Sequence, residues 1–145
     1  MNTALASISV KSPEQSETIL HQGKVVCMIV RAELTPSETT FYTPDHFNIQ
    51  VGKIVYPAGS EIPRHVHHPV IRHVSGTAEV LIVQKGRMIV DLYREDHELL
   101  CSRHIGAGDV LVLLGVGHGF RLLDDTVLIE VKQGPYFGPQ EKEQF

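Results

Sequence analysis

The chain has 145 residues, of which 42% are hydrophobic and 21% charged, so it is long enough to bury one core and its composition argues against disorder. Its formal net charge of −4 argues against nucleic acid as a partner, because the protein's own field would repel a polyanion. Residues 1–10 lack the features of a secretory signal and no stretch approaches the roughly 20 apolar residues of a membrane span, so we expect a cytoplasmic protein with no membrane partner.

The two ends of the chain differ in composition from its middle. Residues 1–22 are polar with little periodicity, so we expect an extended N-terminal arm with one short strand at Ser7 to Lys11. Residues 23–137 are expected to form a single domain. Residues 138–145 are expected to be a flexible tail, because prolines interrupt the sequence around them.

Strand-like segments follow one another through the middle of the chain. Lys24 to Arg31 is the first, apolar on both faces, and residues 33–44 have the Thr, Ser and Pro content of a loop. Short segments then recur between Gly and Asp turns: Glu79 to Gln84, Arg87 to Tyr93, Leu99 to His104, Val110 to Leu114, His118 to Leu123 and Thr126 to Lys132. No segment shows a sustained helical period, and the pattern predicts an all-β sandwich or barrel of the jelly-roll kind.

Histidines cluster between the first strand and this series. Four of the nine in the chain are His65, His67, His68 and His73. If His65-Val66-His67 lies in a strand, both flanking imidazoles point the same way, with Cα atoms roughly 6.6 Å apart. Glu79 opens the next apolar run, and imidazoles with one carboxylate suit Fe(II), Mn, Ni or Zn.

The region around this cluster resembles the first motif of the cupin family, which has a glycine, five residues, His-x-His, a glutamate and a later glycine. The matching residues are Gly59, His65, His67, Glu79 and Gly86. The first and last intervals agree with the family. Eleven residues separate His67 from Glu79, however, where the family has three or four, so the connection between them is longer by seven or eight residues.

A second segment is similar to the family's second motif, which begins with glycine and ends with histidine. Gly108-Asp109 opens it here, and His118 follows the corner that ends at Gly117, with Leu114 where the family usually has proline. The resemblance spans about residues 47–131. It implies a cupin-type double-stranded β-helix, which is a jelly-roll barrel.

The same resemblance implies a divalent metal ion and four metal ligands, His65, His67, Glu79 and His118. Each ligand has a simpler alternative. Glu79 is either a ligand or a charge at the start of a strand, and His118, between two glycines, is either a ligand or a turn histidine without a role.

The remaining histidines are expected to be solvated. His68 would point away from His67, and His73 belongs to the longer connection, where it is a solvated residue, a pocket cap or a replacement for Glu79. Solvation is also the expectation for those in loops or beside turns, namely His21, His46, His97 and His104.

Three further residues are candidates for binding a substrate. Arg64 and Arg72 flank the histidine cluster and offer paired donors to a carboxylate or phosphate, although surface arginines are common. Phe120 belongs to an apolar row expected to line a mostly apolar pocket on the side of Glu79. Near the end of the domain, we expect Glu130 and Lys132 to face solvent.

Three functions remain open from the sequence. The first is a metal-dependent enzyme acting on a small polar or anionic metabolite, since the resemblance implies oxygenases and isomerases. The second is a metal-free sugar-nucleotide isomerase or epimerase-like cupin that uses His65 or His67 as acid or base. The third is a non-enzymatic cupin that binds a small ligand, because function depends on the site rather than the fold.

Assembly and redox state complete the expectations. Lys24 to Arg31 and Glu79 to Gln84 are apolar on both faces, whereas the wall of a monomeric barrel alternates. We therefore predict a homodimer formed by sheet packing, with exchange of the N-terminal arm. Cys27 and Cys101 form no Cys-x-x-Cys pair and are expected to be reduced core thiols.

Overall fold

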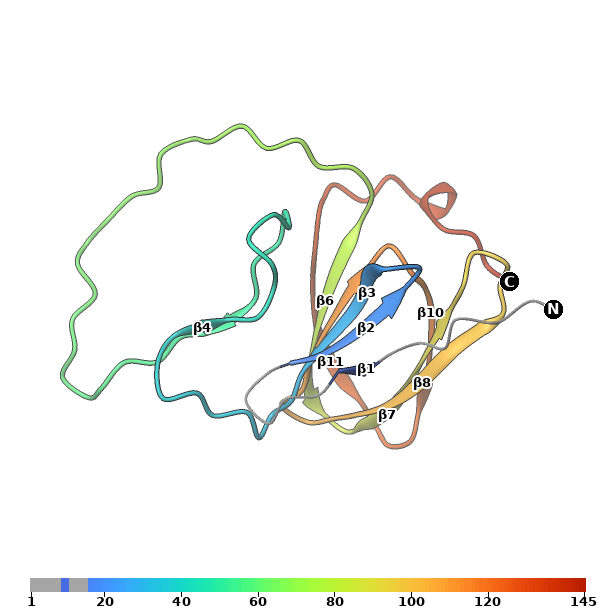
Figure 1. The fold of residues 1–145 in the computed structure, drawn as a ribbon, viewed down its shortest axis with the longest axis horizontal. Coiled ribbons are helices and arrows are strands. Elements are labelled where there is room, and N and C mark those ends of the chain that lie inside the picture. The colour runs from blue at the N-terminus through green and yellow to red at the C-terminus, as the bar shows by residue number, and fades with distance from the viewer. Residues whose placement is uncertain (1–8, 11–15) are drawn as a thin grey trace. The chain divides into compact units, whose positions relative to one another are not determined.

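The computed structural model describes residues 9–10 and 16–145, and the described part is all-β with antiparallel sheets and no α-helix (Figure 1). It divides into two compact units. We call Met1–Leu34 with Thr77–Phe145 the sandwich unit and Thr35–Gly76 the loop unit. Within the described residues, no helix has the length and apolar character needed to cross a membrane.

The sandwich unit contains a six-stranded sheet in the order β1-β2-β3-β9-β6-β11. Its strands are β1 (Ser9–Val10), β2 (Glu17–His21), β3 (Lys24–Val30), β9 (Val110–Leu114), β6 (Ala78–Lys85) and β11 (Val127–Lys132). A three-stranded sheet in the order β10-β7-β8 comprises β10 (Gly117–Leu122), β7 (Arg87–Tyr93) and β8 (Leu99–Gly106). The strands form these separate sheets, so the all-β sandwich is confirmed and the closed jelly-roll barrel stays a prediction.

The core lies between the two sheets and follows the alternation of the strands. On the six-stranded side, Leu81 and Val83 of β6 face inward, and on the other side every second residue of β7 is 0% exposed, namely Met88, Val90 and Leu92. Successive side chains of a strand point to opposite faces, so one sequence register buries the whole row. The predicted strands therefore recur in the structure, with β7 and β9 at the predicted bounds.

The turn between β6 and β7 explains why a glycine stands at position 86. Gly86 has φ +89°, and a Cβ built there would lie 2.6 Å from the carbonyl oxygen of Asp125 and 2.7 Å from Thr126 Oγ1. A side chain is therefore excluded both by the backbone conformation and by the neighbouring turn. The last glycine of the cupin-like motif thus has a structural role here.

Two differences from expectation concern the ends of the chain. Residues 17–21, expected in the arm, form β2, which pairs with β3 and buries Ile19 at 1% exposure. The expected strand at Ser7 to Lys11 is observed as β1, with the rest of that range outside the described residues. Past Lys132 the chain has no strand, and it ends in the 3-10 helix η1 (Pro139–Glu141) and a segment that returns to the sandwich.

Strand β2 also carries a buried carboxylate into the sheet. Glu17 is 4% exposed and accepts hydrogen bonds from Arg31, at 3.1 Å, and from Arg103, at 2.5 Å. Arg31 also donates to Asp109, which accepts from the backbone of Ala32 and caps the turn before β9. A buried charge needs such partners, so this network ties β2 to the β8–β9 region.

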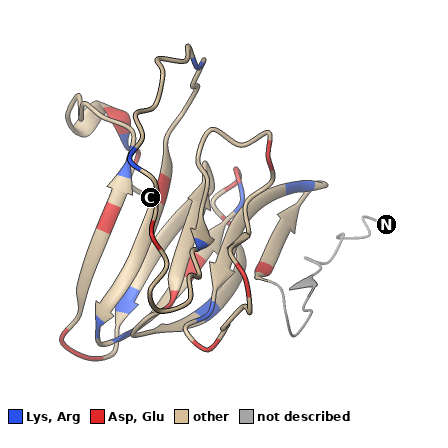
Figure 2. Ribbon diagram, turned by 90° about the vertical axis from the view of Figure 1, so that its left-hand side faces the viewer, with Lys and Arg blue, Asp and Glu red and all other residues tan. Residues whose placement is uncertain are grey.

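The expectation for β11 is confirmed only in part, because Glu130 is exposed whereas Lys132 is half-buried. Leu128 packs on the core, so Glu130 and Lys132 share its inward face, and Figure 2 shows acidic and basic positions as adjacent red and blue bands on this strand. The outward side chains are instead aliphatic and exposed by 47–51%: Val127, Ile129 and Val131. Both faces of β11 are therefore partly exposed, and Lys132 at the end of the strand borders a polar pocket.

The cysteines lie in the core region as free thiols. Cys27 is 0% exposed, and burial, together with nearby Cys101 and Glu17, raises the pKa of its thiol. Cys101 is half-buried, and burial raises the pKa of its thiol as well. Neither side chain therefore tends to form the reactive thiolate at neutral pH.

The loop unit has little regular structure. It contains the two-residue strands β4 (Thr40–Phe41) and β5 (Gly52–Lys53), followed by a segment without strands up to Ala78. The strand considered for His65-Val66-His67 is therefore not formed. Prolines at 63 and 69 flank this tripeptide and lack the backbone donor that a sheet ladder needs.

Candidate functional site

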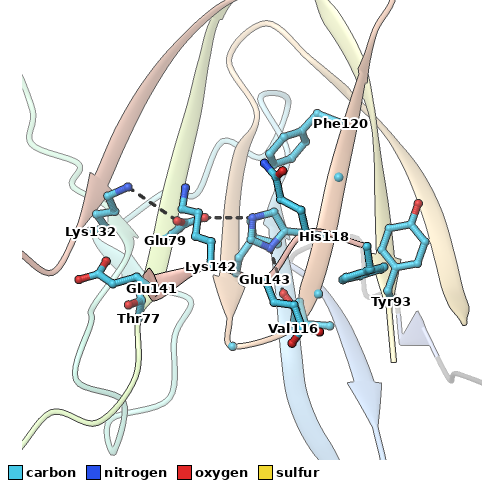
Figure 3. A pocket seen from close by; sticks show the side chains of 16 residues that line it. Thr77, Glu79, Tyr93, Val116, His118, Phe120, Lys132, Glu141, Lys142 and Glu143 are labelled. Atoms are coloured by element: carbon cyan, nitrogen blue, oxygen red, sulfur yellow. Dashed lines mark hydrogen bonds and ion pairs between the residues drawn. The ribbon is translucent and has the colours of Figure 1, made fainter. Parts of the chain in front are cut away.

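A cavity of about 740 Å³ opens at one end of the sandwich unit. Its walls come from the start of β6, the corner between β9 and β10, the ends of β7 and β11, and the segment after η1 (Figure 3). The side chains used below are Glu79, Tyr93, His118, Phe120, Lys132 and Lys142. A concave site with a few convergent polar groups on an apolar wall is typical of small-molecule sites.

Glu79 is the polar residue at the inner end of β6. It is 8% exposed and shares the inward face of the strand with Leu81 and Val83, as predicted. Its neighbours across the sheet are Leu113 of β9 and Lys132 of β11. A carboxylate at this depth needs positive or donating partners, because burial without them is costly.

His118 is the first of those partners. It is the second residue of β10, and its Nε2 lies 3.1 Å from Glu79 Oε2 (Figure 3). Its Nδ1 lies 2.9 Å from the carbonyl oxygen of Val116. A carbonyl oxygen can only accept, so Nδ1 carries a proton and Nε2 directs either a lone pair or a second proton at Glu79.

The contact between Glu79 and His118 would oppose two hydrogen-bond acceptors unless a proton or a metal ion lies between them. Glu79 and a neutral His118 would both present lone pairs across the 3.1 Å gap. A proton on Nε2 resolves the conflict, and so does a metal ion bound by both. A carboxylate oxygen and an imidazole nitrogen are donors that a divalent transition-metal ion accepts.

Lys132 is the second partner of Glu79 and lies across the sheet on β11. Its Nζ lies 3.9 Å from Glu79 Oε1 and 2.5 Å from Glu130 Oε1. The hydrogen bond to Glu130, supported by the charges of Glu130 and Glu79, raises the pKa of Lys132. The two carboxylates and one ammonium leave one unit of negative charge for His118 or a metal ion to balance.

Aromatic rings form the apolar side of the cavity. Phe120 lines it and packs on the core, and its ring lies 5.5 Å from that of His118. Tyr93 lines it from the end of β7. Phe120 therefore lies in the wall, as its row in the sequence predicted, and its role in binding a substrate stays a prediction.

The other predicted ligands belong to the loop unit. The rings of His65 and His67 lie edge to face with centroids 5.2 Å apart, and His65 Nδ1 lies 2.9 Å from the carbonyl oxygen of Pro63. That contact fixes the same tautomer as in His118 and directs the lone pair of Nε2 outward. Both histidines are exposed, as are Arg64 and Arg72.

The structure thus brings the predicted ligands together as two pairs, one in each unit. In residues 9–10 and 16–145, no three His, Cys, Asp or Glu side chains gather into a group that would hold a metal ion. His68 and His73 are exposed, as expected, and the carbonyl of His73 accepts a hydrogen bond of 3.1 Å from Asn48.

Two histidines expected to be solvated have partners in the structure. The side chain of His21 is only 15% exposed and its Nε2 lies 3.1 Å from Glu95. The ring of His97 stacks on Phe145 with centroids 4.0 Å apart. Both contacts join residues distant in sequence, so neither could be predicted from the local pattern.

Sequence reasoning also missed Lys132 as a pocket residue. The signal was present, since Leu128, Glu130 and Lys132 alternate with the aliphatic residues of β11. We placed the charged side in solvent because a charged face usually is solvated. The contribution of residues 141–145 to the cavity had no signal in the sequence.

Comparison of the chain with protein-family models, with curated proteins and with solved structures finds no match. The likeness to cupins therefore rests on the motif residues themselves.

Proposed function

We propose that the cavity of the sandwich unit is a metal-dependent site for a small polar or anionic metabolite. The observation that carries this proposal is the pair of Glu79 and His118, whose facing acceptors need a cation between them. The donor set of one carboxylate and one imidazole, with a backbone carbonyl fixing the imidazole, is common in metal sites. Fe, Mn, Ni or Zn fits these donors.

His65 and His67 of the loop unit are proposed as metal ligands on the basis of the cupin-like motif. The Pro63 carbonyl leaves His65 Nε2 available as a ligand, just as the Val116 carbonyl does for His118. A connection of this length without regular structure is uncommon in compact proteins unless it serves a function. Arg64 and Arg72 are proposed to bind an anionic group of the metabolite, and Phe120 its apolar part.

A bound divalent ion would act as a Lewis acid on a substrate oxygen. The residues of the chain supply the rest of the site. Glu79 and His118 would hold the ion from two strands of the sandwich, and Lys132 would balance the carboxylate oxygen that does not face His118. Tyr93 and Phe120 line the cavity and would limit the access of water. These are the contributions expected of a protein around a metal centre.

A metal-free enzyme is the second candidate, and Lys132 favours it. Its ammonium supplies a fixed positive charge 3.9 Å from Glu79, so a protonated His118 completes the charge balance without a metal. In this case His118, rather than His65 or His67 alone, is placed to exchange a proton with a substrate. The third candidate, a cupin that binds a ligand without reaction, uses the same cavity.

Metal content separates these candidates. In protein purified without added metal, we expect elemental mass spectrometry to find about one equivalent of Fe, Mn, Ni or Zn per chain. Glu79→Gln and His118→Gln are expected to lower that content at least tenfold, because each removes a ligand. Glu33→Gln and His104→Gln, which change the same residue types at exposed positions outside the cavity lining, should retain it. A metal-free wild type would refute the metal proposal.

We also propose that the protein is a homodimer. On the outward face of the six-stranded sheet, one cross-strand row runs from Met28 through Val112 and Val80 to Val131. The first three are at most 6% exposed although they lie outside the core between the sheets, and Val131 is 51% exposed. The exposed aliphatic side chains of the edge strand β11, Val127, Ile129 and Val131, favour a partner at this edge, and light scattering that gave the monomer mass of 16.1 kDa would refute it.

A further inference from the structure

The segment of residues 137–145 covers part of the cavity. Residues 141–145 all line it, although they are distant in sequence from the strands that form the other walls. Figure 3 shows Glu141, Lys142 and Glu143 beside Glu79 and His118. The segment therefore stands between the polar pair and solvent.

The segment contacts the other walls of the cavity through the aromatic ring of its last residue, Phe145. The Phe145 ring stacks on His97, with centroids 4.0 Å apart and an interplanar angle of 6°, and meets the Tyr93 ring edge to face at 5.3 Å. Tyr93 is the last residue of β7, and His97 lies in the connection from β7 to β8. Gly117 lies beneath the contact, where a Cβ would be 3.4 Å from Phe145 Cζ.

The rest of the segment is held by bonds within itself. Phe137 N donates to Glu141 Oε1 at 2.8 Å, Glu141 N to the Gly138 carbonyl at 3.1 Å and Lys142 N to the Pro139 carbonyl at 3.0 Å. In the described part of the chain, the hydrogen bonds of residues 137–142 all stay inside this segment. It can therefore move as one piece without breaking a hydrogen bond to the sandwich.

Two features make the segment suited to opening. Gly134 precedes the segment, and no atom lies within 4 Å of a Cβ built on it, so the backbone there has the freedom that a hinge needs. Phe145 is 61% exposed, so its docking covers only part of the ring. An aromatic contact of this kind favours the closed form by about 2- to 12-fold.

We propose that residues 137–145 form a lid over the cavity, latched by Phe145 on His97 and Tyr93 and hinged at Gly134. The lid controls access to Glu79 and His118. The inference rests on the proposed function only in that the cavity is the ligand site. The lid itself follows from the ring contacts and from the self-contained hydrogen bonds of the segment.

The rate at which diethylpyrocarbonate modifies His118 tests the lid, because the reagent must enter the cavity. Chelator-treated full-length protein is used, and mass spectrometry resolves each histidine, with exposed His104 as internal reference. Phe145→Ala and His97→Ala are each expected to raise the His118 rate about 2- to 12-fold, the factor by which the ring contact favours closure. Phe145→Tyr, which keeps a ring, should react as the wild type does.

Phe137→Ala is the matched control. Phe137 belongs to the same tail and is 69% exposed, and its hydrogen bonds use backbone atoms alone. The control is expected to leave the His118 rate unchanged. Equal rates in wild type, Phe145→Ala and His97→Ala would overturn the lid, as would an equal rise in Phe137→Ala. A metal-free wild type with the expected rate changes would refute the metal proposal and leave the lid standing.

Discussion

The sandwich unit and the loop unit represent opposite ways of holding a functional side chain. In the sandwich, Glu79 projects from β6, whose inward residues Leu81 and Val83 are at most 2% exposed, and His118 projects from β10 beside the partly buried Phe120. In the loop unit, every residue from Tyr56 to Gly76 is exposed, including His65 and His67. The first pair is positioned by packing, whereas the second is positioned by local contacts alone.

Truncating one isoleucine in each unit gives the largest expected contrast. Ile29 is 0% exposed in the core, and Ile29→Ala should lower the free energy of unfolding by about 2–5 kcal/mol, because it leaves a cavity. Ile71 is 88% exposed, and Ile71→Ala should change the free energy of unfolding by no more than about 0.5 kcal/mol. Urea unfolding followed by circular dichroism measures both. Equal losses would show that the loop unit packs as tightly as the sandwich.

Two glycines with positive φ sharpen the comparison. Gly86, at φ +89°, has no room for a Cβ, so Gly86→Ala should destabilise the sandwich by about 2–4 kcal/mol through backbone strain and collision with Asp125. Gly59, at φ +84°, has no atom within 4 Å of a built Cβ, so Gly59→Ala should cost about 1 kcal/mol. Thermal unfolding monitored by calorimetry distinguishes them. A larger effect at Gly59 would contradict the assignment of tight packing to the sandwich alone.

The smallest effect concerns an ion pair on the three-stranded sheet. Hydrogen bonds from Arg121 and Ser102 lower the pKa of Asp91 to about 2. A carboxylate with a lowered pKa stabilises the folded state at pH values above the ordinary pKa of aspartate. This stabilisation is lost as the pH falls toward about 2, the pKa of Asp91 in the folded protein. Arg121 is 61% exposed, so screening keeps the contribution near 1 kcal/mol.

Asp91→Asn is therefore expected to lower the free energy of unfolding by about 1 kcal/mol at neutral pH, with the difference disappearing near pH 2. Urea titrations at the two pH values provide the measurement. A difference that persisted at the acidic end would assign the effect to packing rather than charge.

The strands of the sandwich could be predicted because period-two alternation is a local property. Met88, Val90 and Leu92 mark one face of β7, and the Lys85-Gly86 turn marks where it begins. The pair of Glu79 and His118 was also accessible, since the cupin-like motifs placed both residues in one site. Their contact confirms proximity, while metal binding stays a prediction.

What the sequence did not reveal depends on contacts between distant segments. Lys132 reaches Glu79 because β11 pairs with β6 in a register that sets these two residues opposite each other. Phe145 docks on His97 through a return of the chain that no local pattern encodes. The irregular path around His65 was missed for a different reason, because prolines outweighed the alternation that a His-x-His tripeptide suggests.

The exposure of residues 56–76 has an evolutionary consequence. Because these side chains are all exposed, substitutions among them carry little penalty for folding, and the segment can change in sequence and length while the sandwich is inherited intact. Any position in it that descendants of this protein hold fixed is held by selection on what the protein binds or does. New ligand preferences can therefore arise in this segment while the sandwich is unchanged. Purifying selection on His65 and His67 would indicate that these residues are retained for their chemical function and not for folding.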